Sequence, residues 1–185
     1  MKNAYFEIPI PINEPVKEYR EGSAEKENLV NTLNKMKEKP INIPMIIDGK
    51  EITTEKKIKI TAPHDHNLHL GDFYEGDKSH VKMAIKSAKK AKNNWGSMSW
   101  QSRASIFLKA AELIAGPYRS KINASTMLGQ SKNIYQAEID AACEFIDFLN
   151  FNASYMEEIY KNQPESSDGM WNRLDYRPLE GYVFA

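Results

Sequence analysis

Cysteine and long hydrophobic runs are scarce in this 185-residue sequence. Its one cysteine, Cys143, excludes a disulfide framework and a zinc ribbon. No apolar run approaches the roughly 18 residues that cross a bilayer. Near the start of the chain, Pro9 and Pro11 prevent a helical signal-peptide core, and acids such as Glu7 are untypical of a mitochondrial presequence. We therefore predict a protein of the reducing cytoplasm that has no membrane partner.

An excess of charge of either sign is also absent. The 25 Lys and Arg residues balance the 25 Asp and Glu residues, and 41% of the residues are hydrophobic. This composition argues against a disordered acidic chain and against a nucleic-acid binder. The sequence contains neither G-x-G-x-x-G nor G-x-x-x-x-G-K-[ST], so the usual phosphate loops are missing. One segment does concentrate lysines, which we interpret as a solvated helix face: Lys78, Lys82, Lys86, Lys89, Lys90 and Lys92.

The part of the chain before position 77 mixes one helical segment with strand-like segments. Residues 1–15 contain several prolines and are expected to be extended, and the apolar spacing predicts a helix over Ala24–Lys39. Asp48-Gly49 tolerates the positive φ angles of a tight turn and predicts a β-hairpin. The predicted strands are Met45–Ile47, Lys50–Ile60 and Leu68–Tyr74.

Residues 77–162 have helical periodicity with clear breaks. Ser79 and Ser99 are candidate N-caps, and Gly116-Pro117 ends the second of these helices. Pro117 is suited to the first position of a short helix that closes at Gly129. The strongest periodic element is one long helix from Asn133 to Lys161.

Strand-like sequence resumes toward the C-terminal end of the chain. Met170–Tyr176 is strand-like, and Tyr182–Ala185 is an apolar run typical of a buried parallel strand. A buried parallel strand needs partner strands and a crossover helix, and none follows. We therefore predict an α/β fold that is incomplete within these residues.

Cys143 is the obvious candidate for a nucleophile. At about 100° per residue, Asp140, Glu144 and Asp147 surround it on the outer side of the long helix. Negative neighbours raise the pKa of a thiol and disfavour the reactive thiolate. We interpret Cys143 as an inert helix cysteine.

The spacing of His64, His66 and His69 suggests a metal site, with Asp65 and Asp72 as oxygen ligands. Along an extended segment, however, neighbouring side chains point to opposite faces rather than to one ion. We interpret these residues as polar turn residues and predict no metal.

Glu138 is the one charge on the apolar stripe of the long helix. The stripe consists of Ile134, Ala141, Ala142, Phe145, Leu149 and Met156. An acid is almost never fully buried without a partner, so Glu138 must meet a cation, a backbone donor or a wet cavity. The sequence leaves open whether this environment is a structural ion pair or a functional cavity.

Several contiguous stretches share a recognisable pattern. They are Asn13–Val16, Asp77–Ser79, Arg103–Leu113, Gly116-Pro117, Thr126–Lys132, Gln136–Asp140 and Pro178–Gly181. Together they resemble the N-terminal part of the Δ1-pyrroline-5-carboxylate dehydrogenases, also called L-glutamate γ-semialdehyde dehydrogenases. This group is a branch of the aldehyde dehydrogenase superfamily, and the resemblance covers nearly all of the chain.

The resemblance implies an NAD-dependent oxidoreductase that converts L-glutamate γ-semialdehyde to L-glutamate in proline catabolism, and a homo-oligomer joined through a small β-flap. Family order places the cysteine nucleophile, the glutamate base and the cofactor site after the strand that begins at Tyr182. We therefore predict no catalytic and no cofactor-binding residue in this chain, and no activity of the chain alone. Glu138 matches an acidic position near the aldehyde pocket and is our candidate substrate-pocket residue.

The resemblance divides the chain into four parts. These are an N-terminal arm with one helix (1–44), the β-hairpin and short strand (45–76), the helical part of the Rossmann-type NAD-binding domain (77–162), and a flap strand with the first, truncated Rossmann strand (163–185). Two hypotheses follow: the N-terminal portion of a dehydrogenase, or a stand-alone non-enzymatic protein that docks on a full-length dehydrogenase subunit.

Overall fold

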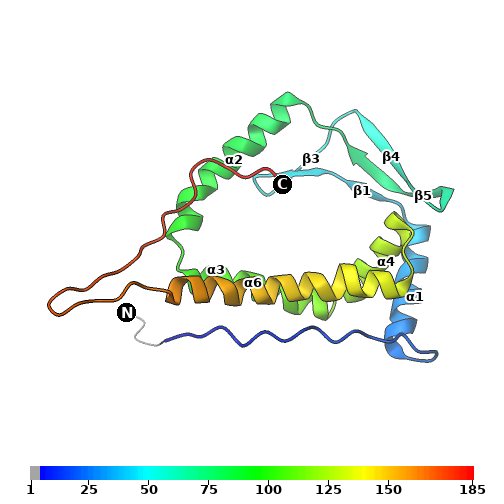
Figure 1. Cartoon of the computed structure of the whole chain (residues 1–185). Helices are drawn as coiled ribbons and strands as arrows, with labels where there is room; N and C mark the ends of the chain where they lie inside the picture. Colours follow the sequence, from blue (N-terminus) through cyan, green and yellow to red (C-terminus); the bar gives the residue numbers. More distant parts are fainter. Residues whose placement is uncertain (1–4) are drawn as a thin grey trace.

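The structure, a computed structural model, describes residues 5–185 and confirms the mixed α/β class. Figure 1 shows α3 (Trp100–Ala115), α4 (Arg119–Gln130) and α6 (Glu144–Lys161) lying together as one helical block. From one end of this block, α2 (Lys78–Ser97) leads toward the strands (Figure 1). Within residues 5–185 we find no helix with the length and apolar character needed to cross a membrane.

An extended N-terminal segment, residues 5–19, lies along α6 (Figure 1), and we call it the arm. Carboxylates of α6 hold its backbone: the N–H of Ile8 donates to Glu157 at 2.9 Å, and that of Glu14 donates to Asp147 at 2.7 Å. The arm leads into α1 (Ala24–Glu38), which Ser23 caps by accepting from the N–H of Lys26. The predicted helix over Ala24–Lys39 is therefore confirmed.

The strands form two small sheets. They are β1 (Ile41–Ile43), β2 (Met45–Ile47), β3 (Lys50–Ile52), β4 (Lys57–Ala62) and β5 (Asp65–Tyr74). β2 and β3 form the predicted hairpin, with Asp48 and Gly49 at φ angles of 55° and 72°. In the three-stranded sheet the order is β1-β5-β4, with β1 parallel and β4 antiparallel to β5.

The prediction of one strand over Lys50–Ile60 is wrong. β3 ends at Ile52, and β4 turns away to pair with β5, which starts at Asp65 and is longer than expected. β1 was not predicted, because the short stretch between Pro40 and Pro44 carries too little periodicity to indicate a strand.

The helix boundaries follow local hydrogen bonds more closely than residue preferences. Asp77, not Ser79, caps α2: its carboxylate accepts from the N–H groups of Ser79 and His80. Gly96 lies inside α2 rather than after it. Ser99 caps α3 as predicted, by accepting from the N–H of Ser102.

The short helix α4 is shifted from its predicted position. It begins at Arg119 after the N-cap Tyr118, so Pro117 precedes the helix instead of opening it. It also continues past Gly129 to Gln130 and ends where Ser131 takes a left-handed φ of 57°.

The predicted long helix is interrupted by a π-helical segment. α5 (Ile134–Ala137) leads into η1 (Glu138–Cys143), where the N–H of Glu144 bonds the carbonyl of Ile139, and then into α6. A π segment adds a residue to a helical turn and rotates the following residues by about 100°. Phe145 is consequently exposed, whereas Ile146, which the predicted stripe omitted, is only 1% exposed.

The C-terminal segment that follows α6 contains no regular strand. The strands predicted at Met170–Tyr176 and Tyr182–Ala185 are absent, and Phe184 is 94% exposed rather than buried. A strand is stabilised by ladder hydrogen bonds to a neighbour, and none of the described strands pairs with this segment. Its assignment to a flap strand and a Rossmann strand stays a prediction.

Two small apolar clusters hold the helices together. One joins α1 to α4 through Leu29 and Ala124, with Tyr19 of the arm. The other joins α3 to α6 through Ala111, Ile114 and Ile146. The carboxylate of Glu138 lies at the start of η1, beside the arm and α4.

Candidate functional site

Glu138 is fully buried, and both of its carboxylate oxygens are hydrogen-bonded. Oε1 accepts from the backbone N–H of Lys17 at 2.8 Å, while Oε2 accepts from the Tyr19 hydroxyl at 2.8 Å and from Asn123 Nδ2 at 2.7 Å. Arg119 Nη2 donates to Oε1 at 2.5 Å. Three separate segments, the arm, α4 and η1, therefore meet on one carboxylate.

Arg119 is buried as deeply as its partner and connects Glu138 to the arm. Its Nε also contacts both oxygens of Glu138, at 3.2 and 3.3 Å. On the arm, the guanidinium donates to the Glu14 carboxylate and, at 2.9 Å, to the carbonyl of Pro15. The planar fork of arginine suits such multiple contacts with carboxylates, which lysine could not reproduce.

The charges in this cluster are fixed near neutral pH. Burial by itself raises the pKa of Glu138, but the hydrogen bonds from Arg119, Lys17, Tyr19 and Asn123 outweigh it and hold that pKa below its ordinary value. Burial, reinforced by the Glu138 carboxylate, raises the pKa of the Tyr19 hydroxyl. Glu138 is thus an anion and Tyr19 a neutral hydrogen-bond donor. This arrangement fixes the arm and α4 on η1 but provides no proton that could be transferred.

Cys143 lies beside this cluster, and its predicted position on the outer side of the helix is wrong. The rotation in η1 turns it inward, where it is 4% exposed, and Arg119 Nη2 approaches its Sγ at 3.4 Å. Burial and the nearby Glu138 carboxylate raise the pKa of the Cys143 thiol to about 11. A protonated, buried thiol is a poor nucleophile, so burial supports the interpretation of an inert cysteine, which stays a prediction.

The three histidines are dispersed, each with its own surroundings. His64 Nδ1 lies 2.8 Å from the Ser131 hydroxyl, His69 Nε2 lies near the carbonyl of Gly71 and the carboxylate of Asp72, and His66 is exposed. In the part of the chain that the structure describes, no three His, Cys, Asp or Glu side chains are placed to hold a metal ion.

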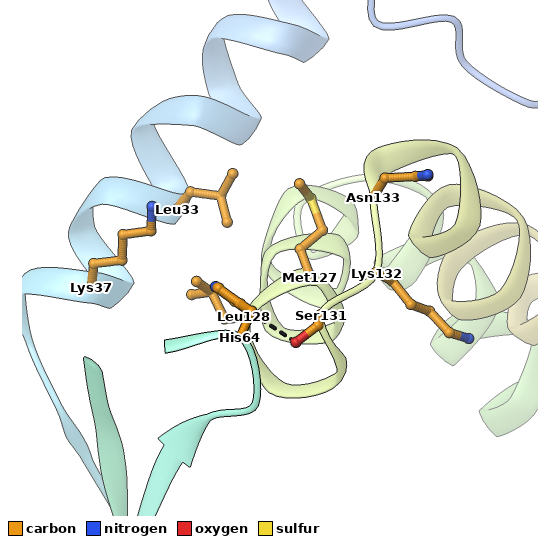
Figure 2. Close-up of a pocket in the computed structure, with 8 residues that line it drawn as sticks. All are labelled: Leu33, Lys37, His64, Met127, Leu128, Ser131, Lys132 and Asn133. Atoms are coloured by element: carbon orange, nitrogen blue, oxygen red, sulfur yellow. Dashed lines mark hydrogen bonds between the residues drawn. The ribbon is translucent and has the colours of Figure 1, made fainter. Parts of the chain in front are cut away.

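His64 lines a shallow pocket of about 310 Å³ between α1, α4 and the β4–β5 turn (Figure 2). Leu33, Met127 and Leu128 form its apolar wall, and Ser131 contributes its hydroxyl group. Lys132, which also lines it, is paired with Asp140 at 2.5 Å. The pocket lies on the surface, whereas Glu138 is sealed inside, so the two are separate features.

The sequence pointed to Glu138 but not to its partners. Arg119 follows a Gly-Pro break and looks like an ordinary solvated first-turn residue, and Asn123 and Tyr19 carry no charge that would mark them. The absence of any other charge on the stripe was the available signal, since a buried acid requires a partner. Which partner it finds depends on how the arm and α4 pack.

Comparisons with known proteins identify one family. The sequence profile of the aldehyde dehydrogenase family matches residues 50–185. A Delta-1-pyrroline-5-carboxylate dehydrogenase from Agaricus bisporus is 49% identical over 98% of this chain, and the match covers 34% of the fungal protein. The mitochondrial enzyme of the same name from Homo sapiens is 40% identical over 94% of the chain and 31% of its own length.

A solved structure gives the same result. The crystal structure of the Delta-pyrroline-5-carboxylate dehydrogenase from Mycobacterium tuberculosis bound with NAD and cobalamin superposes with a TM-score of 0.96 at 42% identity. The superposition covers 98% of this chain and 34% of the mycobacterial chain. This chain therefore spans about a third of the length of the relatives it matches.

Proposed function

Because the chain belongs to the aldehyde dehydrogenase family, we propose that it forms the N-terminal third of an enzyme that oxidises L-glutamate γ-semialdehyde to L-glutamate with NAD. The observation that carries this proposal is the superposition on the mycobacterial dehydrogenase over 98% of the chain. Identity of 42–49% with proteins of this name supports the substrate class. The enzyme would act in proline catabolism.

We infer no cradle for NAD among the residues that the structure describes. A dinucleotide places its pyrophosphate at the open N-terminus of a helix that follows a parallel strand. Here α2 follows β5, the strand paired in parallel with β1, but the Asp77 carboxylate occupies the N-terminus of α2. Hydrogen bonds from Ser79 and then His80 hold the pKa of Asp77 well below its usual range, so this group is an anion and would repel a phosphate. We propose that residues outside this chain bind NAD.

We also propose that the chain does not supply the nucleophile. Aldehyde oxidation by this family begins with attack of a thiolate, and Cys143, the one cysteine of the sequence, is buried with a raised pKa. We therefore propose that this chain alone does not oxidise the aldehyde. What it contributes is the helical block and the fixed carboxylate of Glu138.

Assembly and compartment are further parts of the proposal. A homo-oligomer is expected from the family resemblance, with a small aldehyde as the substrate and with no nucleic-acid or membrane partner. A cytoplasmic location rests on the acids and prolines of residues 7–15, but the names of several relatives, including the human one, carry the word mitochondrial. Imaging the full-length gene product with a fluorescent tag decides between these compartments.

A chimeric enzyme tests the proposed function directly. Residues 1–185 are joined to the part of the Agaricus bisporus dehydrogenase that follows its matched third, and NAD reduction is measured with pyrroline-5-carboxylate. We expect kcat/KM within about tenfold of the fungal enzyme, a loss of about 1.4 kcal/mol or less of transition-state stabilisation. A soluble, correctly assembled chimera without activity would contradict the proposal.

Two controls make this test specific. The fungal remainder without residues 1–185 should be inactive, because it lacks the helices that complete its fold. The Cys143→Ser chimera should keep its activity, because Cys143 is not the nucleophile. If turnover is lost in that variant while the protein remains folded, our assignment of Cys143 is wrong.

A second candidate function is a stand-alone protein that docks on a full-length dehydrogenase subunit without catalysing a reaction. The observation that favours it is α2, a 20-residue helix in which no residue is fully buried. This alternative predicts an inactive chimera and a chain that co-purifies with the intact dehydrogenase from the same source. If the DNA after the Ala185 codon continues the open reading frame, that result would favour the first function.

The place of Glu138 at the aldehyde pocket stays a prediction. Glu138→Gln in the chimera removes the charge with little change in shape, and a substrate-pocket role predicts a drop of at least about tenfold in kcat/KM. A purely structural role predicts unchanged kinetics, measured well below the melting temperature, together with a loss of stability because Arg119 loses its partner.

A further inference from the structure

A second pocket, of about 330 Å³, lies where the C-terminal segment passes α2 and the end of α6. Figure 1 shows this segment, drawn in red, crossing α2. Pro178 packs so closely on Gly96 that a Cβ at position 96 would lie 2.9 Å from it, so a glycine is needed there. The pocket is therefore formed by α2, α3, α6 and the C-terminal segment together.

Three cations line this pocket. Lys92 comes from α2, Arg103 from α3, and Arg177 from the C-terminal segment. The carboxylate of Glu180 pairs with Lys92, and its side chain is 90% exposed, so it lies at the rim rather than filling the pocket. Within residues 5–185, Arg103 and Arg177 make no ion pair. The pocket thus carries excess positive charge.

Arg103 holds spare hydrogen-bond donors at this position. Its Nη2 donates to the Tyr160 hydroxyl at 2.9 Å, while its Nε is buried and has no acceptor in the described part of the chain. A buried guanidinium donor without an acceptor is costly, and such a group in a native protein requires an explanation. A carboxylate or phosphate oxygen is the acceptor that an arginine binds best.

Aromatic side chains surround Arg103 and line the rest of the pocket. Tyr160 is stacked between neighbours: Trp100 lies at a centroid distance of 6.2 Å with a 25° interplanar angle, and Tyr176 meets it edge-on at 5.4 Å. Trp95 and Tyr176 form apolar walls of the pocket. Flat apolar walls next to cations suit an anion that carries a planar apolar group.

We propose that this pocket, between α2, α3 and the C-terminal segment, binds a small free oxyanion through Arg103 and Arg177, and prefers one with a planar apolar group. The ligand class is a small carboxylate or phosphate, with the oxygens at the guanidinium groups and the apolar part against Trp95 and Tyr176. The residues of this pocket do not include Glu138 or its partners, and the proposal does not depend on the proposed function.

Titration of the 185-residue chain with three probes tests the site. Inorganic phosphate, acetate and benzoate are added at constant ionic strength, and binding is followed by calorimetry and by the melting temperature. We expect saturable binding with a Kd of about 1 mM for phosphate, and tighter binding of benzoate than of acetate by about threefold or more. Absence of saturation for all three probes overturns the proposal.

Matched arginine variants locate the bound anion. Arg103→Gln and Arg177→Gln should each raise the Kd about tenfold, because each removes a charge-assisted hydrogen bond. Arg173→Gln is the control: Arg173 lies on the same segment but pairs with Asp175, and its side chain is exposed, so its loss should leave the Kd unchanged. Equal binding by all three variants overturns the proposal. If Arg103→Gln does not fold, the exposed Arg177 decides.

The chimera distinguishes a free ligand from a carboxylate side chain supplied by the rest of an enzyme. A free-ligand site keeps its benzoate affinity, within about threefold, in the chimera. Loss of binding there while the isolated chain still binds would mean that another segment fills the pocket, and it would overturn the proposal. Neither result depends on catalytic activity, so failure of this inference and failure of the proposed function can be told apart.

Discussion

In the helical block of α3, α4, η1 and α6, Glu138 is fully buried and Ile146 is 1% exposed, whereas no residue of α2 is fully buried and its Val81 is 58% exposed. The block is stabilised by apolar contacts and by one saturated buried carboxylate. α2 is held by its Asp77 cap and by surface pairs such as Lys90–Asp48 and Lys92–Glu180. Stability therefore resides in the block, and α2 offers its apolar side for contact.

The largest expected effect comes from Arg119→Met. This change leaves the Glu138 carboxylate buried without its cation, and breaking a buried pair in this way typically costs about 3–5 kcal/mol. Urea denaturation of wild type and variant measures the difference. Lys109→Met on the exposed face of α3 is the control and should change the stability by less than about 0.5 kcal/mol. An Arg119 variant as stable as this control would show that the pair does not hold the block together.

The next effect compares the two regions through apolar truncations. Ile146→Ala removes a buried side chain and should cost about 2–5 kcal/mol, whereas Val81→Ala on α2 should cost less than about 0.5 kcal/mol. Both are measured by the same denaturation experiment. Similar losses for the two variants would mean that α2 is packed in solution and that the contrast is wrong.

A smaller effect is expected on the loss of folding stability at low pH. The pKa of Glu138 is depressed in the folded chain, so its contribution to stability is fully present above the unfolded pKa of a glutamate, about 4.3, and is lost as pH falls through the lower folded pKa. Denaturation midpoints measured between about pH 7 and pH 3 should fall less steeply for Glu138→Gln than for wild type. Parallel curves would indicate that other carboxylates dominate the acid response.

The last expected effect is on a rate rather than on stability. With a pKa raised to about 11, the Cys143 thiol is almost entirely protonated at about pH 8, so a disulfide reagent should react about 100-fold or more slowly with the folded chain than with the chain in urea. Absorbance of the released thiolate follows both reactions. Rapid labelling of the folded chain would place Cys143 at an accessible surface.

The sequence was sufficient to predict those features of the fold that depend on local interactions. Asp48-Gly49 specified the hairpin, Ser99 specified a helix start, and the charge of Glu138 on an apolar stripe indicated a buried carboxylate. Periodicity failed where the backbone departs from the regular α-helical repeat. The π segment after Ala137 rotates Cys143 inward and exchanges Phe145 for Ile146, and no residue type announces such an insertion.

The residues that contact Glu138 from distant parts of the chain could not be predicted from the sequence either. Arg119, Tyr19 and Lys17 meet Glu138 only because the arm and α4 pack on η1. The same holds for the C-terminal segment after α6. Tyr182–Ala185 has the composition of a buried strand, but a strand forms only beside a hydrogen-bonding neighbour, and composition does not specify that neighbour.

The hold on the arm has a consequence for the order of events during synthesis. The N–H groups of Lys17, Glu14 and Ile8 donate to acceptors that lie 121, 133 and 149 residues later in the chain. At about 5–20 residues per second, a ribosome needs roughly 7–30 s to deliver the last of them. The arm therefore leaves the ribosome before the residues on which it docks, and the exposed isoleucines at positions 10 and 12 remain available to chaperones throughout that interval.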